Sequence, residues 1–413
     1  MLANDTTTGL RCRECAAEYP IEPRSICDEC FGPVEVEYDL AAAAARLTPE
    51  AVAAGPPSLW RYAALLPADG PAVDMGAGFT PLRRAERLGE RLGIDDLWIK
   101  DDTVNPSGSF KDRVVSVAIT AAIRFGFEAV ACPSTGNLAN ATAAAAAAAG
   151  IPAYIFIPAD LERAKIAATA AYGATVVAVD GTYADVNRLC AELAEERPWA
   201  FVNVNVRPYY AEGSKTLGFE TAEQLGWKLP DHVVVPIASG ALLTKIHRGF
   251  RQLVGAGAVD ERRVRFSGAQ AAGCGPVAAA FREGRDDVRP VKPDTIARSL
   301  AIGNPADGYH ALRLARETGG AIDDVTDDEV IDGIRLLAET EGVFAETAGG
   351  VTIGVLRKLR ARGVIGADET VVAYVTGNGF KTVEAIADHV RPTVTVAPSV
   401  AEVDAALSAV VAP

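Results

Sequence analysis

Residues 105–113 read Asn-Pro-Ser-Gly-Ser-Phe-Lys-Asp-Arg. Asn-Pro and Ser-Gly are turn-forming pairs, so the first half of this stretch is predicted to be a loop. Lys111 is then expected at or near the start of a helix, where the positive end of the helix dipole disfavours an ammonium. Because a neutral amine is the form that makes Schiff bases, Lys111 is a candidate for chemistry. The helix is predicted from apolar residues at helical spacing, namely Val114, Val115, Val117, Ala118 and Ala121.

Short β-branched runs alternate with helical patterns from about residue 97 to residue 375. This alternation is typical of an open, mainly parallel α/β sheet. In the tail we expect one more strand at residues 393–396 and a helix at 403–411. The predicted strands of the main body are residues 97–100, 129–132, 153–157, 175–179, 200–204, 233–235, 264–266 and 371–375.

Three loops that directly follow predicted strands carry polar residues and glycine. Ligands of open α/β sheets bind at the carboxyl ends of the strands, and the N–H groups at a helix start can hold an anion. Each loop alone is also typical of a turn or a helix cap without a ligand. The loops are Ser134-Thr135-Gly136-Asn137, Pro236 to Ala241, and Thr376-Gly377-Asn378-Gly379.

Four cysteines near the N-terminus form two Cys-x2-Cys pairs, Cys12 with Cys15 and Cys27 with Cys30. Two such pairs can close one tetrahedral thiolate site, so we expect a zinc ion here. Because four thiolates leave no open coordination position, this zinc is expected to be structural and not catalytic. The alternative is four reduced thiols without a metal.

The composition is that of an acidic globular protein, with 49% hydrophobic and 23% charged residues and a net charge of −14. Such a charge argues against nucleic acid or an anionic membrane as the main partner. No apolar run reaches the length of a membrane span, and the first residues lack the basic and apolar regions of a secretory leader. We therefore expect a cytoplasmic protein that acts on a small molecule.

Lys111 and the three loops together resemble the fold-type II pyridoxal-phosphate-dependent enzymes and, among them, the threonine synthase family. The similarity covers most of the chain and includes Glu212-Gly213-Ser214-Lys215-Thr216 and Ile302-Gly303-Asn304-Pro305. The cysteine pairs followed by Phe31-Gly32-Pro33 resemble a ribbon that a subset of this family carries. The resemblance implies two open, mainly parallel α/β domains, similar to the tryptophan synthase β fold, and a small N-terminal zinc ribbon.

The chain is predicted to divide into four parts. The alanine-rich stretch and the Gly-Pro pairs after the cysteines indicate a helical arm and a linker. The parts are residues 1–38, the four-cysteine ribbon; residues 39–75, the arm and linker; residues 76–110 with 226–413, a large cofactor-binding α/β domain; and residues 111–225, a small α/β domain.

The resemblance implies a role for each cofactor-facing residue. Lys111 would bind pyridoxal 5'-phosphate covalently and act as the catalytic base. Asn137 would contact the phenolic oxygen of the cofactor, and Thr376 its pyridine nitrogen. A hydroxyl at that nitrogen leaves it largely unprotonated, which suits elimination and replacement chemistry. The cofactor phosphate would lie on Ala238, Ser239, Gly240, Ala241 and Leu242, and the substrate carboxylate on Ser134, Thr135 and Gly136.

The implied enzyme is a lyase that converts O-phosphohomoserine and water into L-threonine and phosphate by β,γ-replacement, and a homodimer is implied as well. Two arginines that are common in the family, one of them for the substrate phosphate, are replaced here by Tyr210 and Ala301. We expect Arg207, Lys215 or Arg298 to supply the missing positive charge.

These departures leave alternatives open. One is a related pyridoxal-phosphate enzyme, such as a cysteate synthase that joins phosphoserine and sulfite, a serine or threonine dehydratase, or a replacement enzyme of secondary metabolism. A second is a non-catalytic binding protein on the same scaffold. In a third, the ribbon binds a partner and catalysis is secondary.

Overall fold

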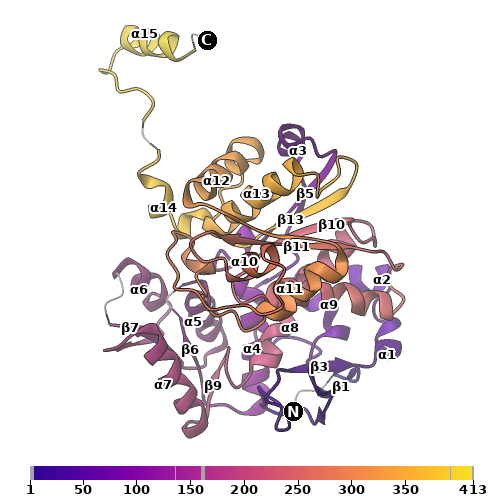
Figure 1. Cartoon of the computed structure of the whole chain (residues 1–413). Coiled ribbons are helices and arrows are strands. Elements are labelled where there is room, and N and C mark those ends of the chain that lie inside the picture. Colours follow the sequence, from indigo (N-terminus) through magenta and orange to yellow (C-terminus); the bar gives the residue numbers. More distant parts are fainter. Residues whose placement is uncertain (1–3, 135, 160–162, 391, 412–413) are drawn as a thin grey trace.

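A computed structural model describes residues 4–134, 136–159, 163–390 and 392–411, and it contains three β-sheets with surrounding helices (Figure 1). The fold is of the α/β class that the alternating sequence pattern predicts. The predicted four-part division of the chain stays a prediction, but the order of the strands in the sheets shows which segments lie together.

The N-terminal module is a small antiparallel sheet of order β2-β1-β3. It lies beside α8 and α9 (Figure 1), and β3 contacts α8 directly. The segment that follows is helical, as the alanine-rich sequence predicts. The elements are β1 (Thr7–Cys12), β2 (Glu18–Tyr19), β3 (Val34–Tyr38), α1 (Leu40–Ala44), α2 (Pro49–Ala53) and the 3-10 segment η1 (Leu59–Leu65).

The largest of the three sheets has six strands in the order β12-β11-β10-β13-β5-β4. Its strand pairs are parallel except for the antiparallel pair of β4 and β5. Its central strands are apolar on both faces because helices cover both sides. The strands are β4 (Leu82–Arg84), β5 (Asp96–Asp101), β10 (His232–Pro236), β11 (Arg265–Ala271), β12 (Ile322–Val325) and β13 (Thr370–Val375).

The third sheet has four parallel strands in the order β8-β7-β6-β9. The strands are β6 (Ala129–Pro133), β7 (Ala153–Pro158), β8 (Thr175–Val179) and β9 (Trp199–Phe201). The predicted strand 200–204 is shorter than expected, because residues 202–206 form a turn that leads into α8.

The helices connect the strands of the two larger sheets, and α8 packs against both α4 and α9. α12 begins with a capping box, in which Thr326 and Glu329 satisfy each other's backbone N–H groups. The helices and 3-10 segments are α3 (Glu86–Leu92), η2 (Asp102–Val104), α4 (Lys111–Phe125), α5 (Asn137–Ala149), α6 (Arg163–Ala170), α7 (Tyr183–Glu196), α8 (Arg207–Gln224), α9 (Ala241–Gly255), α10 (Pro276–Arg282), η3 (Arg298–Leu300), α11 (Gly308–Thr318), α12 (Asp327–Glu341), α13 (Thr347–Ala361) and η4 (Gly379–Lys381).

The C-terminal tail leaves the body through α14 (Glu384–Ala387) and ends in α15 (Val400–Val411), which stands apart from the rest of the chain (Figure 1). The predicted tail helix is confirmed, but the predicted strand at 393–396 is wrong. Among the described residues that segment has no neighbouring strand to pair with, and an isolated strand is not stable. Within the described parts of the chain, no helix has both the length and the apolar character needed to cross a membrane.

Candidate active site

Lys111 is the first residue of α4, directly after the loop that the sequence predicts. The backbone N–H of Phe110 donates to the carbonyl oxygen of Thr376 (2.9 Å), and that of Asn378 donates to Gly108 (2.9 Å). These bonds join the lysine loop to the end of β13. Two segments that are 265 positions apart in the sequence, around Lys111 and Thr376, therefore form one structure.

A fully buried ion network fixes the start of α4. Arg113 donates from Nε to Asp102 Oδ2 (2.7 Å) and from Nη2 to Glu220 Oε2 (2.8 Å). Lys100 Nζ lies 2.7 Å from the same Glu220 oxygen. Burial alone would raise the pKa of Glu220, but the charges of Arg113 and Lys100 hold that pKa at about 2. The helix that carries Lys111 therefore begins on a rigid, charge-balanced support.

The amine of Lys111 has one hydrogen-bond partner in the described part of the chain. Its Nζ donates to the hydroxyl oxygen of Tyr210 (3.0 Å) and lies 4.4 Å from the ring centroid of Phe110. Tyr210 lies in the first turns of α8. The sequence marks this tyrosine only as the residue at a position where the family often has an arginine, so its contact with Lys111 was not predicted.

Glu346 joins two further loops of the site. Asn137, the first residue of α5, donates from Nδ2 to Glu346 Oε2 (2.9 Å). The Glu346 carboxylate lies against Gly377, where a Cβ would come within 2.3 Å of its Oε1, so a side chain at Gly377 would displace it. Burial raises the pKa of Glu346, while the amide of Asn137 and the charges of Lys381 and Lys111 oppose that shift. A buried carboxyl group thus lies between the Asn137 loop and the Thr376 loop.

The loop 238–242 connects β10 to α9 and has the features of an anion site. Gly240 has a φ of 94°, and a Cβ there would lie 2.6 Å from the carbonyl oxygen of Asp307, so only glycine fits. The N–H of Asp307 donates to the carbonyl oxygen of Ser239 (2.8 Å). The N–H groups in the first turn of α9 have no acceptor within the helix, so they can bind a phosphate.

The loop before α5 places Ser134 and Gly136 next to Asn137. Ser134 is buried, and its Oγ accepts from the N–H of Gly136 (3.3 Å). Thr135, the remaining candidate of this loop, lies outside the described residues. The free N–H groups at the start of α5 can receive a carboxylate, so the predicted substrate role of this loop is compatible with the geometry.

Sequence comparisons agree with this geometry. A family model described as "Pyridoxal-phosphate dependent enzyme" matches residues 73–377. The threonine synthase of Methanosarcina acetivorans is 38% identical over 382 residues, which are 92% of this chain and 93% of that protein. The threonine synthase of Methanocaldococcus jannaschii is 36% identical over 379 residues, with 91% and 93% covered. The chain belongs to the threonine synthase family of pyridoxal-phosphate-dependent enzymes.

Solved structures show the same fold. A fungal L-serine ammonia-lyase from Rhizomucor miehei matches with a TM-score of 0.62 and 22% identity, and covers 75% of this chain and 96% of that chain. Diaminopropionate ammonia lyase from Escherichia coli matches with a TM-score of 0.63 and 20% identity, with 76% and 88% covered. At these identities the similarity concerns the fold alone, which is the fold-type II fold expected from the sequence.

The residues of the site fit the cofactor of the threonine synthase family. Lys111 offers an amine for the aldehyde, the start of α9 offers N–H groups for the phosphate, and Thr376 directly follows β13, where its carbonyl joins the lysine loop. Ser109 Oγ, two residues before the lysine, is buried without a hydrogen-bond partner among the described residues. Because this hydroxyl lies two residues from Lys111, it is placed to bond to a group held there.

The three basic candidates for the substrate phosphate have different surroundings. Arg207 starts α8, and its Nη2 donates to Asp307 Oδ2 (3.0 Å), beside the loop 238–242. Arg298 lies exposed in η3. Lys215 is fully buried and forms an ion pair with Glu212 one helical turn away, with its amine 3.9 Å from the ring centroid of Tyr38. Because its side chain is fully buried, Lys215 is out of reach of a substrate phosphate, whereas the side chain of Arg207 is 35% exposed.

The four cysteines of the ribbon come together as the sequence predicts. Their Sγ atoms all lie within 4.8 Å of one another. Cys12 and Cys30, and likewise Cys15 and Cys27, are 3.5 Å apart at sulfur. Tetrahedral coordination with bonds of about 2.3 Å places sulfur atoms about 3.8 Å apart, so the cluster has the size of a metal site. The ribbon can therefore hold a metal ion through four thiolates.

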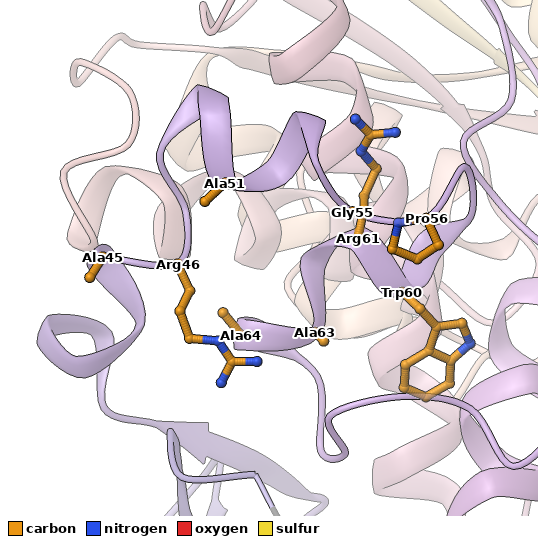
Figure 2. Close-up of a pocket in the computed structure, with 9 residues that line it drawn as sticks. All are labelled: Ala45, Arg46, Ala51, Gly55, Pro56, Trp60, Arg61, Ala63 and Ala64. Carbon is orange, nitrogen blue, oxygen red and sulfur yellow. The ribbon is translucent and has the colours of Figure 1, made fainter.

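A cavity of about 290 Å³ lies away from this site, within the arm formed by α1, α2 and η1 (Figure 2). Its lining includes Arg46 and Arg61, whose guanidinium groups point away from each other (Figure 2). Arg46 is paired with Asp69 and Arg61 with Glu223. Since both charges are already matched, this cavity offers no free cation for an anionic ligand.

Proposed function

We propose that the enzyme is a threonine synthase, which converts O-phosphohomoserine and water into L-threonine and inorganic phosphate. The observation that carries the proposal is the match to curated threonine synthases over nine-tenths of both chains. The arrangement of Lys111, Asn137, Thr376 and the loop 238–242 supports it. These residues offer a suitable partner for the aldehyde, the phenolic oxygen, the pyridine nitrogen and the phosphate of the cofactor, respectively.

Pyridoxal phosphate, when bound, would supply the electron sink that allows protons to leave the carbon that bears the amino group and the carbon after it. The amine of Lys111 is the base that removes these protons and returns one. Tyr210, 3.0 Å from Nζ, keeps this amine in place and can pass a proton to it. Residues Ser134 and Gly136 hold the substrate carboxylate, and Asn137 is oriented by its bond to Glu346.

Arg207 is the proposed receptor of the substrate phosphate, because it lies beside the loop 238–242 through their common contact with Asp307. We also propose that the four-cysteine site holds a structural zinc ion, that the enzyme is a cytoplasmic homodimer, and that residues 76–110 with 226–413 and residues 111–225 form the large and the small α/β domains. The two larger sheets support this division, because each is built from strands of one of these parts.

The test is the release of inorganic phosphate and the formation of threonine from O-phosphohomoserine by the purified enzyme with its cofactor. O-phosphoserine with and without sulfite, L-serine and L-threonine serve as competing substrates, and the Lys111→Ala variant as the blank. Threonine and phosphate in equal amounts are expected. No turnover of O-phosphohomoserine together with turnover of another substrate would overturn the proposal.

One observation favours a second candidate, a related replacement or elimination enzyme. Tyr210 contacts the catalytic lysine from a position where an arginine for the substrate phosphate is common in the family. A tyrosine there lowers the positive charge of the substrate site. The same substrate panel distinguishes this candidate, since it predicts that O-phosphoserine or an unphosphorylated hydroxy amino acid is used more efficiently than O-phosphohomoserine.

A further inference from the structure

The four-cysteine ribbon docks on the helices that carry the active site. Tyr209, next to Tyr210 in α8, donates from its hydroxyl to the carbonyl oxygen of Glu22 (2.7 Å). Lys245 of α9 lies 2.9 Å from Glu35 of β3. The carboxylate of Glu14 lies 3.0 Å from the imidazole of His310 in α11. The ribbon thus contacts α8, α9 and α11, and two of these helices begin at the proposed phosphate-binding groups.

One contact reaches the phosphate loop itself. Arg13 lies between the first two cysteines of the ribbon, and its Nη1 donates to Asp307 Oδ1 (3.3 Å). The other carboxylate oxygen of Asp307 accepts from Arg207 (3.0 Å). Asp307 is nearly buried, with a side-chain exposure of 8%. A carboxylate that is removed from water in this way requires its cationic partners, so the two arginines determine where Asp307 lies.

The backbone of Asp307 in turn shapes the loop. Its N–H binds the carbonyl oxygen of Ser239, and its carbonyl oxygen occupies the space where a Cβ of residue 240 would lie. A displacement of Asp307 therefore moves the turn at Gly240, from which the N–H groups of α9 start. On the ribbon side, the N–H of Arg13 donates to the carbonyl oxygen of Pro33 (3.0 Å), which ties the first cysteine pair to the segment after the second.

We propose that Arg13 and Asp307 are positioning residues that couple the metal site of the ribbon to the cofactor-phosphate loop. Metal binding fixes the first cysteine pair and with it Arg13; Arg13 holds Asp307; and Asp307 holds the loop 238–242 in its phosphate-binding shape. This rests on the proposed function only in that the loop receives the cofactor phosphate. Because coupling between two sites is reciprocal, the cofactor must stabilise metal binding as much as the metal stabilises cofactor binding.

The experiment compares Arg13→Gln with the matched control Arg24→Gln. Arg24 is also a ribbon arginine, but its ion pairs among the described residues are with Glu22 and Asp28 of the ribbon itself. Two dissociation constants are measured for each zinc-loaded protein without substrate. The first is that of pyridoxal phosphate, from the absorbance of the bound cofactor. The second is that of zinc, from competition with a chromogenic chelator, with and without pyridoxal phosphate.

In the wild type and in Arg24→Gln, pyridoxal phosphate is expected to tighten zinc binding at least about fivefold, the lower range of measured site-to-site couplings. In Arg13→Gln this effect disappears, and the dissociation constant of pyridoxal phosphate rises by the same factor. Arg13→Lys, which keeps the charge, recovers part of the coupling. Asp307→Asn, which keeps the backbone contacts with the loop, loses the coupling as Arg13→Gln does.

Equal zinc affinity of the wild type with and without pyridoxal phosphate would overturn the proposal, as would full coupling in Arg13→Gln. Failure of the proposed function is distinguishable from both results. If the wild type shows coupling between pyridoxal phosphate and zinc but does not turn over O-phosphohomoserine, the coupling proposal stands and the proposed substrate is wrong.

Discussion

Two lysines that the sequence predicts to be in the active site, Lys111 and Lys215, have opposite surroundings in the structure. Lys111 starts α4, is half-buried, and has the hydroxyl of Tyr210 as its hydrogen-bond partner in the described part of the chain. Lys215 lies inside α8, is fully buried, and is paired with the carboxylate of Glu212. Burial lowers the pKa of Lys215 and its partner Glu212 opposes that shift. The first amine is available for chemistry, and the second is part of the interior.

The difference shows that the surroundings of Nζ, and not the family segment that contains a lysine, decide its role. A hydroxyl hydrogen-bonds an amine without adding a charge, whereas a buried carboxylate pairs with the amine and would be left as an unpaired buried charge without it. Four experiments test this contrast, either at the two lysines or at the groups around them.

The largest effect is expected for Lys111→Ala. Because the variant has no base at the reacting carbons, turnover should fall by a factor of at least about 10³. The fold should change little, since the ion network below α4 does not include Lys111. Phosphate release and the urea midpoint of unfolding are measured in parallel. Residual activity above about one-hundredth of the wild type would contradict the catalytic assignment.

Lys215→Met should affect stability and not the chemical step. It leaves the buried Glu212 without its main partner, which costs about 3–5 kcal/mol of unfolding free energy. The double variant Glu212→Gln with Lys215→Met removes both charges and should recover most of this loss. Lys228→Met, at an exposed lysine, is the control and should stay within about 0.5 kcal/mol. If Lys215→Met is as stable as the wild type but binds the substrate more weakly, Lys215 takes part in substrate binding.

Acid should destabilise the buried ion network of Glu220, Arg113 and Lys100 at the start of α4. The pKa of Glu220 is about 2 in the folded protein against an ordinary value of 4.5, because Arg113 and Lys100 offset the effect of burial. A depressed carboxyl pKa stabilises the fold fully above pH 4.5, and this contribution is lost as the pH falls from 4.5 through 2. The loss amounts to roughly 3 kcal/mol. Urea midpoints of unfolding between pH 5 and pH 2.5 measure this loss. If the stability of Glu220→Gln falls with pH as steeply as that of the wild type, other groups cause the loss.

The smallest effect is expected for Tyr210→Phe. One hydrogen bond to Lys111 is worth about 1 kcal/mol, so kcat should fall about threefold to tenfold with little change in KM. Because the hydroxyl acts through the lysine amine, the pH at which kcat is half-maximal should shift as well. A variant with an unchanged pH profile but a raised KM for the phosphorylated substrate would place Tyr210 at the substrate and not at the lysine.

Features that are encoded by a few consecutive residues could be predicted from the sequence. The loop-to-helix change at Lys111, the cysteine pairs and eight of the ten strands of the two larger sheets follow from turn residues, ligand spacing or β-branched runs; the short strands β4 and β12 were not predicted. The strand at 393–396 failed because a β-branched run also needs a neighbouring strand, and only the tertiary structure shows whether one exists.

The residues that were missed act through contacts between distant segments. Tyr210 is 99 positions from Lys111, Glu346 is 209 from Asn137, and Asp307 is 294 from Arg13. No periodicity or local motif encodes such pairs. Lys215 was misplaced for the same reason: its segment resembles a family segment, but the buried carboxylate beside it becomes visible only when α8 is packed.

The position of the ribbon has a consequence for how the chain is made. Its strands are complete by Tyr38, but its docking partners reach as far as His310. At about 5–20 residues per second, synthesis of the intervening chain takes about 14 to 54 seconds. During that time the ribbon can close around a metal, but Arg13 and Glu14 still lack their partners Asp307 and His310. The ribbon therefore leaves the ribosome well before its docking partners and reaches its final position only after they have been made.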